Sequence, residues 1–175
     1  LEFSICGGSK KLIGGQVLDL EGEGKDLSKA QLIRIHENKT AALLTTSLRL
    51  GGMTANATPR QLEALTDFGY NLGLAFQVID DVINLQGFGK SLKTKAEDLI
   101  EGKITAPVIR CLMAHKDAPE KQQWLWAQYQ VPSEERDIAG MVELIEASGA
   151  FDECIAEANG MVDDAWRAVD AAVPD

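Results

Sequence analysis

The chain has 175 residues, of which 45% are hydrophobic and 25% are charged, so we expect a folded protein with a sizeable core and not a disordered chain. Its formal charge of −10 excludes nucleic acid as an expected partner, because phosphate backbones need clustered lysine and arginine. No apolar run approaches the roughly 20 residues of a membrane-spanning helix, and the first residues lack the charged-then-apolar pattern of a secretion signal.

Residues 1–25 are rich in glycine and contain a short apolar patch. The simplest interpretation is a helix end followed by a loop, because glycine weakens helices and favours turns. On that interpretation Gln16 and Asp19 are a polar pair near the end of a helix.

A capping box at Ser28 and Gln31 predicts the start of a helix that runs to Gly51–Gly52. Its apolar stripe steps by three and four residues through Leu32, Ile35, Lys39, Leu43, Thr46 and Leu50. Lys39 interrupts this stripe, so its ammonium group either extends outward to solvent or meets an anion. His36 lies one step off the stripe and fits a surface or core-edge position better than a ligand or a base.

Thr58, Pro59 and Gln61 open the next helix, as N-cap, first helical residue and capping-box partner. An apolar stripe follows at helical spacing: Leu65, Phe68, Leu72, Phe76, Ile79 and Ile83. Gly69 and Gly73 each cost about 1 kcal/mol against alanine in a helix. Because glycine lowers the stability of a helix by this amount, its presence at both positions indicates the close approach of another helix or of a ligand.

A second face of this helix carries polar groups one turn apart: Gln77, Asp80, Asp81 and Asn84. Two adjacent carboxylates in apolar company repel each other, so either this side is solvated or a cation lies there. Oxygen ligands of this kind suit Mg²⁺, which proteins often hold by one or two carboxylates plus substrate phosphates. The pair Asp163–Asp164, with Arg167 nearby, is typical of an exposed ion-pairing surface.

The rest of the chain indicates further helices and no strands. We expect helices that begin near Thr105 and Pro119, a third capped by Ser133, and a last one over 151–173 that is interrupted at Gly160. The whole chain, residues 1–175, is thus predicted to be one all-α unit. The three cysteines lack metal-ligand spacing, which favours reduced thiols and a cytoplasmic protein.

Several motifs together resemble the trans-isoprenyl diphosphate synthases, the family of farnesyl, geranylgeranyl and octaprenyl diphosphate synthases. They are GGQVLDL (14–20), Lys39–Thr40, FQVIDD (76–81), Gly89–Lys90 and DLIEGKITAPV (98–108). Their order matches the C-terminal half of that family and covers nearly the whole chain. The resemblance implies a helical bundle of the isoprenoid synthase type.

The resemblance also implies roles for individual residues. Asp80 would be the principal ligand of Mg²⁺, with Asp81 and Asn84 as further contributors; Asn84 stands where the family usually has aspartate and brings no charge. Lys39 and Thr40 would contact the allylic diphosphate together with Gln77. Lys90 and Lys103 would touch the departing diphosphate or shape the loop over it, and Gln16 and Asp19 would face the reaction cleft.

The implied activity is Mg²⁺-dependent condensation of an allylic diphosphate with isopentenyl diphosphate, in a homo- or hetero-oligomer. In the family the first aspartate-rich motif and the basic residues for isopentenyl diphosphate precede GGQ, and this chain has no sequence there. We therefore predict little or no turnover by this chain alone. The alternatives are a non-catalytic subunit or helical interaction module that associates with a complete synthase, and a fragment of an active enzyme.

Overall fold

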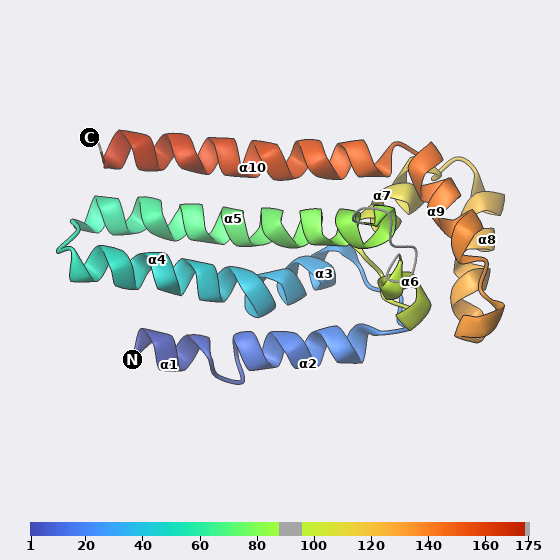
Figure 1. Cartoon of the computed structure of the whole chain (residues 1–175), viewed down its shortest axis with the longest axis horizontal. Helices are drawn as coiled ribbons and strands as arrows, with labels where there is room; N and C mark the ends of the chain where they lie inside the picture. Colours follow the sequence, from blue (N-terminus) through green and yellow to red (C-terminus); the bar gives the residue numbers. More distant parts are fainter. Residues whose placement is uncertain (88–95, 174–175) are drawn as a thin grey trace. The chain divides into compact units, whose positions relative to one another are not determined.

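The computed structural model describes residues 1–87 and 96–173, and all regular structure in this part of the chain is helical. The all-α prediction is therefore confirmed. The elements are α1 (Glu2–Cys6), α2 (Leu12–Gly22), α3 (Lys29–His36), a π-helical segment η1 (Glu37–Ala41), α4 (Ala42–Thr54), α5 (Pro59–Gln86), α6 (Glu97–Glu101), α7 (Ala106–Ala114), α8 (Pro119–Gln130), a 3₁₀ turn η3 (Ser133–Glu135), α9 (Ile138–Ala147) and α10 (Ala150–Ala172) (Figure 1). Within the described residues, none of the helices has the length and apolarity to cross a membrane.

The chain divides into two compact units. Unit 1 comprises Leu1–Glu21, Ile33–Gln77 and Glu157–Asp175, and unit 2 comprises Gly22–Leu32 and Val78–Ala156. Helix α5 contributes residues to both units, and so does α10.

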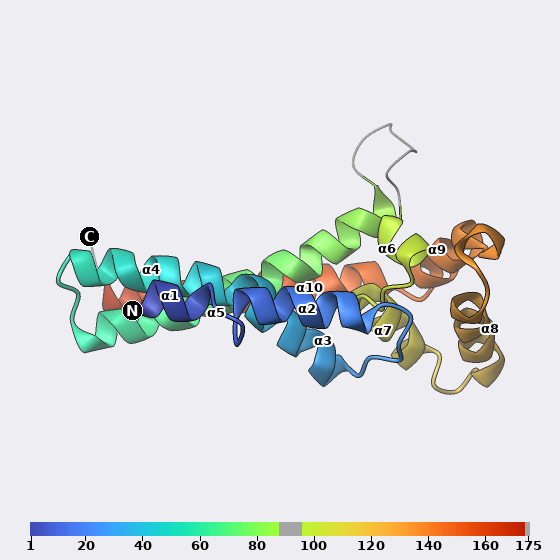
Figure 2. The ribbon, with the colours of Figure 1, turned by 90° about the horizontal axis from the view of Figure 1, so that it is seen from below.

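In unit 1, α4 and α5 run antiparallel and are joined by the turn at 55–58 (Figures 1 and 2). The glycines of α5 make their contact possible: a Cβ atom on Gly73 would lie 2.3 Å from the Cα atom of Ala41, and one on Gly69 would lie 2.6 Å from the Cα atom of Thr45. The prediction that these glycines mark the close approach of another helix is confirmed. Phe68 packs edge-on against Trp166 of α10, with ring centroids 5.6 Å apart.

Helix α4 was expected to continue the stripe of α3 without a break, and this is wrong at Leu43, which is 38% exposed. The cause is the π-helical segment Glu37–Ala41, whose wider turn takes one residue more than an α-turn. The buried face consequently passes from His36 to Ala41, five residues later. From there the side that faces α5 carries Ala41 at the end of η1, and Thr45 and Gly52 in α4.

Three further boundaries differ from the sequence prediction. Residues 12–22 form the helix α2, where a loop was the simplest interpretation. Helix α10 continues through Gly160 without interruption. Helix α9 is capped not by Ser133 but by Asp137, whose carboxylate accepts a hydrogen bond from Gly140 N at 2.9 Å.

The capping boxes were predicted correctly. Gln61 Oε1 accepts from Thr58 N at 2.9 Å, and Gln31 Oε1 accepts from Ser28 N at 2.9 Å. The pair Arg167–Asp164 is an exposed ion pair, as expected. All three cysteines are buried free thiols.

The predicted core stripe of α5 is wrong at Phe76 and Ile83, which are 58% and 37% exposed. A neighbouring face of the same helix is buried instead, through Leu74, Val78, Val82 and Leu85. Both faces of α5 repeat at helical spacing, so periodicity alone does not distinguish them.

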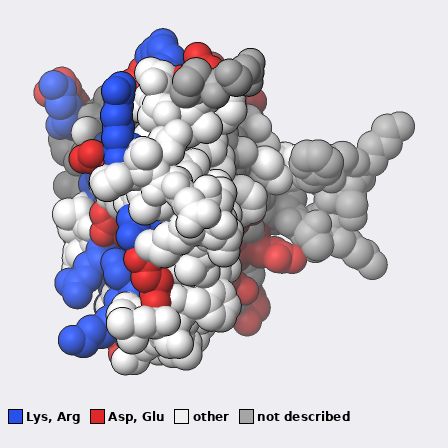
Figure 3. Space-filling view, turned by 90° about the vertical axis from the view of Figure 1, so that its left-hand side faces the viewer, with Lys and Arg blue, Asp and Glu red and all other residues white. Residues whose placement is uncertain are grey.

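The surface of the molecule drawn in Figure 3 has a broad area of uncharged side chains, with charged side chains mainly around it.

Unit 2 has its core where the end of α5 and the helices α6, α7, α8 and α9 supply fully buried side chains. They are Val82, Leu85, Leu99, Val108, Leu125, Met141 and Ile145. Tyr129 of α8 is also buried and packs against Trp126, with ring centroids 5.8 Å apart. This core holds α6 and the residues that follow it in place.

Candidate functional site

The predicted site residues fall into two groups, one in each unit. The first, called here the Lys39 group, lies in unit 1: it contains the predicted residues Asp19, Lys39, Thr40 and Gln77, and His36, which was not predicted to belong to the site. The second, the Lys103 group, lies in unit 2: it contains the predicted residues Asp80, Asp81, Asn84 and Lys103, and also Asp98 and Glu101, which were not predicted. Lys90 lies outside the described residues.

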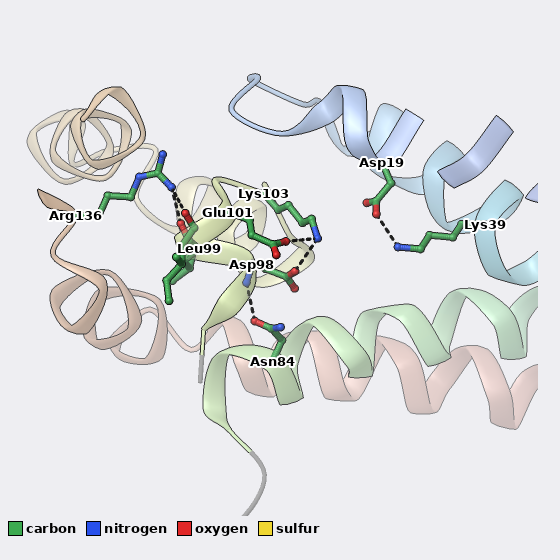
Figure 4. A network of polar contacts seen from close by, with 9 residues as sticks. Asp19, Lys39, Asn84, Asp98, Leu99, Glu101, Lys103 and Arg136 are labelled. Carbon is green, nitrogen blue, oxygen red and sulfur yellow. Dashed lines mark hydrogen bonds and ion pairs between the residues drawn. The ribbon is translucent and has the colours of Figure 1, made fainter. Parts of the chain in front are cut away.

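Lys39 and Thr40 lie in the π-helical segment. Gly15 of α2 packs directly on this segment: a Cβ atom there would lie 2.4 Å from the main-chain nitrogen of Lys39 and 2.7 Å from the carbonyl carbon of Asn38. Because the backbones meet here, Asp19, one turn after Gly15, comes within reach of the lysine side chain. The Nζ atom of Lys39 donates to Asp19 Oδ2 at 2.6 Å (Figure 4).

Of the two alternatives for Lys39, the structure shows an ammonium group that meets an anion, and this anion is a carboxylate of the same chain. The side chains of Lys39 and Asp19 are 33% and 18% exposed, so the pair is only partly shielded from water. Thr40 is half-buried, Gln16 is exposed and Gln77 is buried.

His36 lies beside this ion pair and is buried. Burial lowers the pKa of His36 to about 4; the Asp19 carboxylate acts in the opposite direction and the Lys39 ammonium adds to the decrease. The imidazole is therefore neutral near pH 7 and brings no second positive charge to the group. The sequence predicted a surface or core-edge position for His36, and the structure places it in the core.

The adjacent aspartates of α5 have different environments. Asp80 is exposed, whereas Asp81 is 9% exposed. The Oδ2 atom of Asp81 accepts a hydrogen bond from Ala106 N at 2.8 Å, at the first residue of α7. Thr105 occupies the N-cap position of α7 without making a side-chain capping bond, so the Asp81 carboxylate satisfies this helix end instead.

Asn84 joins the end of α5 to the start of α6. Its Oδ1 atom accepts from Asp98 N at 3.2 Å, and its main-chain oxygen accepts from Ala96 N at 2.8 Å. Ala96 has a left-handed backbone with φ of 62° immediately before α6. The amide of Asn84 thus fixes the short helix α6 (Figure 4).

Lys103 follows α6 and lies between two of its carboxylates. Its Nζ atom is 2.6 Å from Glu101 Oε2 and 3.4 Å from Asp98 Oδ1 (Figure 4). Its main-chain nitrogen donates to Asp98 O at 2.8 Å. The motif around Lys103 was recognised from the sequence, but these carboxylate partners were not assigned. Their spacing, one helical turn apart and just before the lysine, is the signal that could have identified them.

Among the residues that the structure describes, no three His, Cys, Asp or Glu side chains form a group that could hold a metal ion. Asp81 is bonded to a helix end, and Asn84 brings an uncharged oxygen that is bonded to Asp98 N. Asp80 is an exposed residue. Such a donor set fits a hard divalent cation that takes most of its ligands from substrate phosphates and water.

Comparisons with known proteins agree with these motifs. The sequence matches the polyprenyl synthetase family over residues 7–145. It is 39% identical over 124 residues to heterodimeric geranylgeranyl pyrophosphate synthase large subunit 1 of Arabidopsis thaliana, which corresponds to 69% of this chain and 33% of that protein. It is 35% identical over 111 residues to farnesyl diphosphate synthase of Geobacillus stearothermophilus, or 63% of this chain and 37% of that protein.

Solved structures show the same fold. A polyprenyl synthase from Roseobacter denitrificans superposes with a TM-score of 0.83 at 26% identity, and covers 99% of this chain and 56% of its own. A polyprenyl synthase from Caulobacter crescentus, complexed with calcium and isoprenyl diphosphate, has a TM-score of 0.83 at 29% identity, with 99% and 53% covered. The chain therefore spans about a third of the length of the curated relatives cited above, and about half of these solved structures.

Proposed function

Because this chain belongs to the polyprenyl synthetase family, we propose that it takes part in prenyl chain elongation. In this reaction an allylic diphosphate loses diphosphate, the double bond of isopentenyl diphosphate attacks the allylic cation, and a proton leaves. Residues 1–175 would correspond to the C-terminal half of the synthase domain. The match over residues 7–145, which contains all the recognised motifs, carries this proposal.

Two of the proposed diphosphate-binding lysines are already paired with carboxylates. Lys39 is paired with Asp19, and Lys103 with Glu101 and Asp98. These pairs hold half-buried cations in fixed positions, and an entering diphosphate would replace the carboxylates as their partner. Thr40 would add a hydroxyl donor, Gln77 an amide, and Lys90 a further cation.

Asp80 is the proposed ligand for Mg²⁺, with Asp81 and Asn84 as weaker contributors. The ion, when bound, would neutralise the charge that develops on the departing diphosphate. The Caulobacter crescentus relative is complexed with calcium and isoprenyl diphosphate, which supports a divalent cation and a diphosphate as the ligands of such a site. The Asp81 carboxylate would act mainly by holding the start of α7, since its Oδ2 atom is bonded to Ala106 N.

The assignment of Asp80 is tested by titrating the chain with Mg²⁺ and inorganic pyrophosphate in a calorimeter. We expect Asp80→Ala to weaken binding by roughly tenfold, the cost of one charge-assisted contact. Asp163→Ala is the matched control, because Asp163 is also an exposed aspartate that is followed by a second aspartate on a helix. Equal binding by wild type and Asp80→Ala would remove Asp80 from the site.

We also propose that these 175 residues alone have little or no turnover. In the family, two aspartate-rich helices bind the same ions, and this sequence contains the second motif but not the first. The test is incorporation of labelled isopentenyl diphosphate, with Mg²⁺ and an allylic diphosphate, by the chain alone and after addition of a polypeptide that carries the N-terminal half of a synthase. Product with the chain alone would contradict this proposal.

A second candidate function is a non-catalytic subunit or interaction module that associates with a complete synthase. One observation favours it: Ile13, Val17 and Leu20 lie at helical spacing on α2 and are all exposed. Apolar side chains aligned in this way are typical of a surface that another protein covers. Sedimentation of the chain alone and with a complete synthase tests this: a stable complex that changes the rate of the synthase supports the subunit, and independent sedimentation contradicts it.

A further inference from the structure

Arg136 lies in the connection between α8 and α9 and contacts the last turn of α6. Its Nη1 atom donates to Leu99 O at 2.9 Å and to Ile100 O at 2.8 Å, and its Nε atom donates to Gln128 O at 3.1 Å. Figure 4 shows the guanidinium group of Arg136 directed at Leu99. Arginine is suited to such a position because its donors form a rigid planar fork and remain charged.

Gly102, the residue between α6 and Lys103, has φ of 81° and is buried. A Cβ atom on Gly102 would lie 3.3 Å from both Nη atoms of Arg136. The guanidinium group therefore packs against the turn that carries Lys103. The carbonyl oxygen of Gly102 accepts from Gly24 N at 2.8 Å, which fixes the other side of the same turn.

Tyr129 connects Arg136 to Lys103 itself. The guanidinium carbon of Arg136 lies 5.8 Å from the centre of the Tyr129 ring, within the range of a cation–π contact. The Tyr129 hydroxyl group donates to Lys103 O at 3.1 Å. Burial raises the pKa of Tyr129, so the hydroxyl group keeps its proton and remains a donor.

We propose that Arg136 and Tyr129 form a brace that positions Lys103 for diphosphate binding. Arg136 is a positioning residue: it contacts the carbonyl groups of α6 and acts on the substrate through Lys103. This inference rests on the proposed function for the role of Lys103. The physical reason is that a cation binds an anion best when its backbone is held before the anion arrives.

The competing explanation is that Arg136 only caps the end of α6. Capping and bracing predict different results. Capping changes stability, whereas a brace changes the affinity of Lys103 for an anion. A double-mutant cycle on the full chain separates them, with Mg²⁺ and inorganic pyrophosphate as the probe. We expect Arg136→Met to raise the Kd by about tenfold, as loss of an orienting partner does for bound metal ions.

In the background of Lys103→Met, the same change at Arg136 should leave the Kd unaltered, because the residue through which it acts has been removed. Arg136→Lys keeps the charge over Tyr129 but not the fork, so it should restore part of the affinity. Arg110→Met is the matched control, since Arg110 is a half-buried arginine of unit 2 with a weak ion pair to Glu153 at 3.9 Å. We expect its Kd to equal that of the wild type.

Three results would overturn the brace: an unchanged Kd in Arg136→Met, an equal loss of affinity in both backgrounds, or a loss of the same size in Arg110→Met. If the wild type binds no pyrophosphate, or Lys103→Met binds it equally well, the proposed role of Lys103 is wrong. The brace is then decided by NMR of ¹³C-dimethylated lysines, with the Lys103 signal assigned from its absence in Lys103→Met. A Lys103 signal that shifts in Arg136→Met supports the brace, and an unmoved signal refutes it.

Discussion

Gly15 of α2 lies directly against the main chain of Lys39, so closely that a Cβ atom on Gly15 would be 2.4 Å from the Lys39 nitrogen. This contact and the π-helical geometry of 37–41 act together. The wide turn brings the backbone of Lys39 close to α2. Because Gly15 has no side chain, the two backbones can come into contact. The ion pair between Lys39 and Asp19, one turn further along α2, follows from this approach.

Gly15→Ala should therefore destabilise unit 1. A methyl group at position 15 meets backbone atoms, which cannot rotate away, so we expect a loss of about 1–3 kcal/mol in the free energy of unfolding. Urea denaturation monitored by circular dichroism measures it. The Lys39–Asp19 pair should also be disturbed, because both partners depend on the distance between the two backbones.

Gly160→Ala is the control for this substitution. Gly160 lies inside α10, and nothing would lie within 4 Å of a Cβ atom there. Alanine should stabilise this helix by up to about 1 kcal/mol, because glycine is the weaker helix former. Equal stability of Gly15→Ala and the wild type would show that α2 and the π-helical segment do not approach each other as described.

The buried His36 predicts a pH dependence of stability. Its pKa is about 4 in the folded chain, mainly because of burial, against 6.5 as the ordinary value. The unfolded chain therefore binds more protons between these two pH values, and stability must fall as the pH falls through this window. Above about pH 6.5, His36 is neutral in both the folded and the unfolded chain and costs no stability. By pH 4, its lowered pKa reduces the free energy of unfolding by roughly 3 kcal/mol.

Carboxylates also titrate in this range, so the test compares two proteins. The free energy of unfolding is measured from pH 7 to pH 4 for the wild type and for His36→Gln, which lacks the titrating group. The wild type should lose more stability than the variant over this interval. Parallel curves would show that folding does not lower the pKa of His36.

We expect substitutions of the two adjacent aspartates of α5 to differ in their effect on stability. Asp81→Ala removes the acceptor for Ala106 N and leaves the start of α7 without its carboxylate, which should cost about 1–2 kcal/mol of stability. Asp80→Ala changes an exposed side chain and should cost less. Thermal denaturation of both variants, beside the pyrophosphate titration, checks the assignment. A larger loss of stability in Asp80→Ala would contradict it.

The sequence predicted those parts of the fold that depend on local patterns. The reciprocal hydrogen bonds of Thr58 and Gln61 use neighbouring residues, and so they could be identified before the structure. The π-helical segment could not, because it adds one residue without any local marker. The exposure of Leu43 follows from this added residue and was therefore mispredicted.

The same reasoning applies to the candidate site. Motif residues such as Lys39 and Lys103 were identified from the sequence, but their pairing with particular carboxylates was not. The partners Asp19 and Glu101 are defined by how segments approach each other, at Gly15 for the first and after the left-handed Gly102 for the second. The capping role of Asp81 was also missed, because its partner Ala106 is 25 residues away.

Asn84 offers the sharpest test of the proposed metal site, since it stands where the resemblance leads one to expect aspartate. Its Oδ1 atom accepts from Asp98 N at the start of α6, and a carboxylate can accept the same bond. Asn84→Asp should therefore keep α6 in place and change stability by less than about 1 kcal/mol. It adds a negative charge near Asp80, which disfavours the empty site and favours a bound cation.

We accordingly expect Asn84→Asp to bind Mg²⁺ more tightly than the wild type, in the presence of pyrophosphate, by roughly tenfold. Asn71→Asp is the matched control: Asn71 also lies on α5, and its side chain donates to Asp67 O, so the substitution adds the same charge in unit 1. Calorimetry on the three proteins measures the difference. If Asn84→Asp binds no better than Asn71→Asp, the added carboxylate does not face the ion, and the end of α5 is not its binding site.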